Sequence, residues 1–188
     1  KMNTLQQPWI LIGYELFSKE GPHGLKIEVL ARKVKKNKSS FYYHFSDLEN
    51  FTSVLLKYHL ERIELLVETS KACKDSTHEW LVVLLNFKRE LFFNRQLRIN
   101  RSNSSFSLCF SKASELLSTA IMDMWINTLH LYKQSNTPKL LLTLITENFY
   151  LRITEDTFTI EWLAQYTKEI QQVLISLQRD LSHDSIKR

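Results

Sequence analysis

Apolar residues recur at helical spacing along almost the whole chain, and turn signals divide this pattern into segments. The first segment begins near Pro8, buries a stripe containing Trp9, Ile12 and Phe17, and ends at Gly21-Pro22. Two short segments follow at 26–34 and 38–45, joined by a turn of about three residues. A long segment then runs to about residue 71. Asn37 and Asp47 precede the last two segments, where each side chain is placed to cap a helix.

The second half of the chain continues the helical pattern without any motif of its own. Residues 80–92 are apolar on most sides, which predicts a helix buried at the centre of a bundle, beginning near Asp75 or Ser76. The polar residues 94–107 predict a loop or a short irregular helix. Three further helices are expected at 111–133, 139–153 and 160–181. About nine helices in a chain with only three Gly and three Pro predict an all-α fold.

The two short segments have the layout of a helix-turn-helix, the motif that places its second helix in the major groove of DNA. In the first of them Ile27, Leu30 and Ala31 lie on one face, and Phe41 and Phe45 lie one above the other in the second. Residues 26–45 hold six Lys or Arg against the single acid Glu28, an excess equal to the net charge of +5 of the whole chain. A basic surface confined to one motif is expected for a protein that contacts phosphates.

These residues resemble the N-terminal signature of the tetracycline-repressor (TetR) family. The resemblance covers about residues 10–51 and rests on Phe41-Tyr-Tyr-His-Phe45, on Leu30-Ala31 and on the upstream run at 16–21. It implies a DNA-binding head at 1–50 and a helical body at 51–188 that binds an effector and forms a homodimer. It also implies a transcriptional regulator, a repressor in our interpretation, that is released from a palindromic operator by a small molecule.

The sequence departs from the family pattern at three places in and after the motif, and also at the start of the first motif helix. Lys35 stands at the usual turn glycine, Lys36 at a usual apolar position, and Leu48 at the position of a phosphate-contacting Lys. Leu25 and Lys26 replace the small Ser or Thr that commonly starts the first motif helix. Either the motif has drifted, or the phosphate-contacting charge has moved into the turn. Lys35 then requires either a positive φ or a differently shaped turn.

The resemblance and the charge pattern together predict which residues contact DNA. Base edges are expected to face Lys38, Ser39, Ser40, Tyr43 and His44, and phosphates to face Lys33, Lys35, Lys36 and Tyr42, with Arg32 in the same basic surface.

Two further sites are predicted in the body. The last two helices carry more apolar residues than one buried face needs, so we expect a dimer interface that contains Leu141, Leu144, Phe149, Leu163, Tyr166, Ile170, Leu174 and Leu177. An effector pocket for an apolar or aromatic molecule would need aromatic and sulfur walls, for which the candidates are Trp80, Phe87, Phe106, Cys109, Phe110 and Trp125.

Other classes of protein find little support in the sequence. There is no Gly-rich phosphate loop, no Gly-x-Ser-x-Gly and no His-Glu-x-x-His, so we expect neither an enzyme nor a cofactor. Cys73 and Cys109 lack metal-ligand spacing, so no metal is expected. No apolar run is long enough to cross a membrane, and we expect a cytoplasmic protein. The alternative is a ligand-sensing or protein-interaction module whose motif no longer binds DNA.

Overall fold

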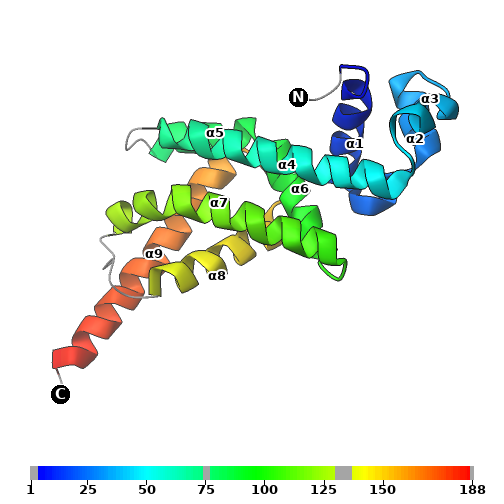
Figure 1. The fold of residues 1–188 in the computed structure, drawn as a ribbon. Helices are drawn as coiled ribbons and strands as arrows, with labels where there is room; N and C mark the ends of the chain where they lie inside the picture. The colour runs from blue at the N-terminus through cyan, green and yellow to red at the C-terminus, as the bar shows by residue number, and fades with distance from the viewer. Residues whose placement is uncertain (1–3, 74–76, 130–136, 187–188) are drawn as a thin grey trace. The chain divides into compact units, whose positions relative to one another are not determined.

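The structure is a computed structural model that describes residues 4–73, 77–129 and 137–186, with side chains described for 4–73, 77–118 and 140–176. Within these residues every regular element is helical, which confirms the predicted all-α fold (Figure 1). The helices are α1 (Gln7–Glu20), α2 (Ile27–Val34), α3 (Lys38–His44), α4 (Leu48–Lys71), α5 (Thr77–Asn86), α6 (Lys88–Ile99), α7 (Ser104–Leu129), α8 (Thr137–Arg152) and α9 (Ile160–Ile186), with a short 3-10 helix, η1 (Gly21–Gly24), after α1. No helix among the described residues is both long and apolar enough to cross a membrane.

The chain divides into two compact units. Unit 1 contains residues 1–67 and 87–116, and unit 2 contains residues 68–86 and 117–188. Unit 1 therefore combines the three N-terminal helices with most of α4, with α6 and with the start of α7. The division expected at residue 50, between a DNA-binding head and a body, is one of function and not of compactness. It therefore stays a prediction.

Unit 1 is built around aromatic side chains from α1, α3, α4 and α6. The Phe17 and Tyr14 rings of α1 stack on Phe93 of α6 with centroids 4.2 Å and 4.5 Å apart. Phe51 of α4 is fully buried and meets the rings of the motif. Because these rings come from segments far apart in the sequence, they hold α3 to α1 and α4, and α1 to α6.

Helix α6 corrects two sequence predictions. Residues 94–99 are helical and not a loop or short irregular helix, since α6 continues to Ile99 and α7 already begins at Ser104. In addition, the single helix expected over residues 80–92 is broken at Phe87, between α5 and α6. The polar residues of α6 are helical because they face inward and find partners. Asn94 accepts a hydrogen bond from the buried His59, and the side-chain amide of Gln96 donates to the Lys19 carbonyl at 3.1 Å.

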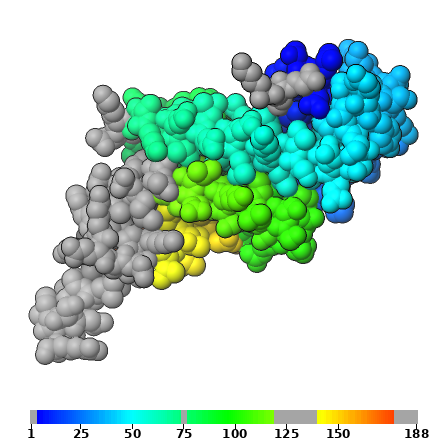
Figure 2. Space-filling view, viewed as in Figure 1, coloured from blue at the N-terminus to red at the C-terminus, as the bar shows by residue number. Residues whose placement is uncertain are grey.

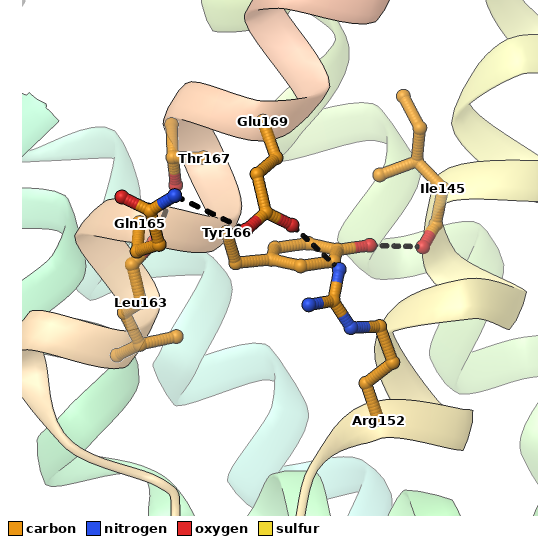
Figure 3. Close-up of polar contacts among 7 residues, drawn as sticks. All are labelled: Ile145, Arg152, Leu163, Gln165, Tyr166, Thr167 and Glu169. Carbon is orange, nitrogen blue, oxygen red and sulfur yellow. Dashed lines mark hydrogen bonds and ion pairs between the residues drawn. The ribbon is translucent and has the colours of Figure 1, made fainter.

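In unit 2, α8 and α9 are joined by polar contacts around one tyrosine. The Tyr166 hydroxyl of α9 donates to the Ile145 carbonyl of α8 at 2.9 Å, and Arg152 donates to the Glu169 carboxylate at 2.8 Å (Figure 3). Burial raises the pKa of Tyr166 to about 12, although the nearby Arg152 acts in the opposite direction. The phenol therefore remains a hydrogen-bond donor at neutral pH, and it fixes how α8 and α9 pack.

Candidate nucleic-acid interface

Side-chain caps define where α3 and α4 begin. The Asn37 side chain accepts a hydrogen bond from the Ser40 amide at 2.9 Å, which confirms the predicted cap of α3. Asp47 caps α4 in the same way by accepting from the Asn50 amide at 2.7 Å. Short polar side chains at these positions accept hydrogen bonds from amide groups that the first turn of a helix leaves unpaired. They therefore fix the start of α3 at Lys38 and the start of α4 at Leu48.

The turn between α2 and α3 has the positive φ that the sequence predicted as one of two possibilities. Lys35 lies in the left-handed region at φ 58° and ψ 43°. The Lys36 amide donates to the Ala31 carbonyl at 2.9 Å, so the turn closes α2 in a hydrogen-bonded C-cap. A residue with a side chain is strained in this conformation, and at this position the chain carries a lysine where a glycine would relieve the strain.

One side of α3 is buried against an aromatic cluster. Phe41 and Phe45 have exposed fractions of 0% and 1%. Their rings lie 5.4 Å and 4.8 Å from Phe51, and Phe41 also meets Trp9 at 5.5 Å. The Gln6 side chain donates to the His44 carbonyl at 3.1 Å and ties the end of α3 to the start of α1. The cluster holds α3 so that its opposite side is turned outward.

Most of the side chains that the sequence assigned to DNA are exposed, on α2, on α3 and in the turn between them. Tyr43 is 83% exposed and Tyr42 is 54% exposed, although tyrosine rings are usually at least half buried in proteins. The remaining exposed members are Arg32, Lys33, Lys35, Lys36, Lys38 and Ser39. Ser40 and His44 are half-buried at the edge of this surface. In Figure 2, residues 27–44 form an uncovered surface of unit 1, drawn in light blue.

One charged residue of this surface was not assigned a role from the sequence. Glu28, in the first turn of α2, accepts a hydrogen bond from the Lys38 ammonium group at 2.5 Å. This hydrogen bond lowers the pKa of Glu28. The signal in the sequence was that Glu28 is the only acid among the six basic residues of the window, but the pairing itself needs α2 and α3 to be placed together.

The predicted dimer residues fall into two groups in the structure. Leu144 is 66% exposed, and Leu141, Phe149 and Ile170 are half-buried. A second group is buried within the single chain and has little surface left for a partner: Leu163, Tyr166 and Leu174. Leu177 lies outside the residues whose side chains are described. Leu140 and Leu151, which the sequence did not assign, are 65% and 64% exposed on α8 and extend the apolar face of Leu144.

The predicted pocket residues have different surroundings in the structure, and the pocket itself stays a prediction. Phe106 packs edge-on against Phe17 with centroids 5.4 Å apart, and the Cys109 thiol donates to the Leu56 carbonyl. Both residues therefore belong to the core of unit 1. Phe110 packs against the same core, Phe87 lies under the Arg62 guanidinium, and Trp80 is buried in unit 2. The side chain of Trp125 lies outside the described residues.

No protein-family model matches the sequence, and no curated protein matches it either. Solved structures do match. A fatty acid degradation regulator, FadR from Bacillus halodurans, has a TM-score of 0.63 at 14% identity, with 93% of this chain and 96% of that chain covered. A protein from Rhodococcus sp. that is assigned to the TetR family of transcriptional regulators has a TM-score of 0.56 at 15% identity, with 95% and 98% covered. The multidrug binding protein EbrR, complexed with imidazole, has a TM-score of 0.54 at 15% identity, with 94% and 96% covered.

The matched structures define the fold of the chain. Each match extends over more than nine tenths of both proteins, so the similarity includes the helices beyond the motif as well as the motif itself. The chain therefore has the all-helical fold of TetR-family transcriptional regulators. At this level of identity the similarity establishes the fold, and the function has to be argued from the site.

Proposed function

We propose that this protein is a TetR-family transcriptional regulator, without enzymatic activity, that binds double-stranded DNA through the exposed surface of α2 and α3. The exposed side of α3 is the observation that carries the proposal. Tyr43 lies almost wholly in solvent while Phe41 and Phe45 are buried behind it, so the helix is held rigidly with its polar side uncovered. Exposed lysines in the turn precede that helix, and this arrangement favours α3 lying in the major groove with the lysines near phosphates.

The phosphate-contacting role of the turn is testable through salt dependence. Lys35 and Lys36 are both exposed, and Lys35 lies in the left-handed conformation that ends α2. If each contacts one phosphate, Lys35→Ala and Lys36→Ala should each weaken binding to all duplex sequences alike and reduce the salt slope by about 0.9. Lys57→Ala is the control, because it removes an exposed positive charge from α4, outside the motif. An unchanged slope in both turn variants would remove them from the contact surface.

A gel-shift titration with random duplex DNA at low salt tests the proposal as a whole. The basic surface predicts at least nonspecific binding, and selection from a random duplex pool should then yield a palindromic site. Absence of binding to any duplex at low salt would favour the alternative, a ligand-sensing or protein-interaction module that has lost DNA binding.

The proposed assembly is a homodimer formed through α8 and α9. Leu140, Leu144 and Leu151 form an exposed apolar face on α8, and Val173 and Ile175 are 56% and 45% exposed on α9. The three leucines of α8 lie on one face, and exposed apolar side chains gathered in this way mark an interaction surface. Two copies paired there would present two α3 helices to successive turns of the duplex. Leu144→Glu should give a monomer in sedimentation equilibrium, whereas Leu108→Glu, at a leucine of α7 that is 58% exposed, should leave the dimer intact.

We also propose that a small apolar or aromatic molecule binds in the body and releases the protein from its operator, so that occupancy of the operator represses transcription. The matched structures include a fatty acid degradation regulator and a multidrug binding protein, and these descriptions support this class of ligand. Phe106 and Cys109 are packed in the core of unit 1, and which of the predicted aromatic residues line the pocket stays a prediction. A ligand that binds the free form more tightly must weaken DNA binding by the same factor, which a titration in the presence of operator measures.

A further inference from the structure

A surface that only binds phosphates gives no reason for the ion pair between Glu28 and Lys38. An acid placed among basic residues reduces the attraction to DNA, and Glu28 is the only acid in the basic window. Stability does not explain the pair either. Its two side chains are 66% and 56% exposed, and exposed ion pairs contribute little to folding. The pair does, however, join the first turn of α2 to the first residue of α3, next to the side of α3 that is turned outward.

The pair presents a donor and an acceptor side by side. The Lys38 ammonium group has three N–H donors and uses one on the Glu28 carboxylate, which keeps lone pairs for a further donor. In the major groove a G·C pair offers two acceptors, guanine N7 and O6, beside one donor, the cytosine N4 amino group. An A·T pair places the adenine amino group between two acceptors, so an ammonium group that meets N7 there is next to a donor.

We propose that Glu28 and Lys38 act as one unit that selects a G·C pair in each half-site, with Lys38 donating to guanine and Glu28 accepting from the cytosine amino group. The residues at the start of the second helix of a helix-turn-helix are those that face base edges, and Lys38 is the first residue of α3. Glu28 holds the lysine in position there and makes a phosphate contact by Lys38 less favourable. The inference rests on the proposed DNA-binding function and adds a specificity residue to it.

Three variants separate this role from a general charge effect. Glu28→Met keeps the length of the side chain and removes the acceptor, and Lys38→Met removes the donor. Glu64→Met makes the same charge change as Glu28→Met on the exposed surface of α4, outside the motif. Each protein is checked for unchanged helicity and then used to select bound sequences from a random duplex pool, followed by titrations against duplexes that differ in the selected pair.

The wild-type protein should select a G·C pair at one position of each half-site and discriminate against A·T there by about tenfold. Glu28→Met and Lys38→Met should both relax selection at that same position, while Glu64→Met should keep the wild-type preference. If both motif variants select the wild-type site with unchanged discrimination, or relax two different positions, the inference is overturned while the DNA-binding function stands. If the wild-type protein binds no duplex at low salt, the proposed function fails and the inference fails with it.

Discussion

The buried histidine of unit 1 makes the stability of the protein depend on pH. His59 has an exposed fraction of 0%, and its ring stacks on Phe93 with centroids 4.3 Å apart. Its Nε2 donates to the Asn94 side-chain oxygen at 2.9 Å, and its Nδ1 accepts from the Tyr14 hydroxyl at 2.7 Å. Both ring nitrogens are thus satisfied in the neutral form, and burial lowers the pKa of His59 to about 4, against the weaker opposing effect of Asn94.

The sign and size of the effect follow from this shift. In the unfolded chain the imidazole binds a proton near pH 6.5, whereas the folded protein resists protonation until about pH 4. The contribution of His59 to the free energy of unfolding is therefore complete above pH 6.5 and is lost as the pH falls through 4. Each pH unit within that window costs about 1.4 kcal/mol, so the loss between pH 7.5 and pH 5 should be about 2 kcal/mol.

Urea unfolding followed by circular dichroism at several pH values measures this loss. His59→Gln is the matched variant, because glutamine is neutral throughout the window and keeps a polar side chain at the position. The variant should be less stable than the wild-type protein at pH 7.5, and the difference between them should shrink by about 2 kcal/mol by pH 5. A difference that stays constant with pH would refute the reasoning, since the acidic groups common to both proteins cancel.

Three further predictions concern other features of the fold. Lys35→Gly should raise the free energy of unfolding by about 1 kcal/mol by relieving the left-handed conformation, whereas Lys35→Ala should not, and both should weaken DNA binding equally; equal stability of the two variants in urea would contradict this. Gly13→Ala should lower stability by about 2 kcal/mol in thermal unfolding, because the new methyl group would overlap the Phe51 ring, and an unchanged melting temperature would disprove the overlap. Tyr166→Phe should cost about 1 kcal/mol through loss of the bond to the Ile145 carbonyl, and a fully stable variant would show that this bond adds nothing.

The sequence by itself determined the features that depend on residues close together in the chain. Asn37 and Asp47 cap the helices that follow them, and each hydrogen bond reaches only three residues along the chain. The spacing of Phe41 and Phe45 places both rings on one side of α3 in the same local way. Lys35 at the usual position of a turn glycine left two possibilities, a positive φ or a differently shaped turn, and the structure shows the positive φ.

The tertiary structure decided the features for which partners come from distant segments. Hydrophobic periodicity predicts a loop at the polar residues Asn94 and Gln96. They lie instead in a buried helix, because His59 and the Lys19 carbonyl form hydrogen bonds with them. Likewise Leu163 was a candidate for the dimer interface from its apolar character alone, and packing within the chain buried it. The pairing of Glu28 with Lys38 depends on the placement of α2 against α3, because burial and hydrogen bonding are set by neighbours in space, which local periodicity does not specify.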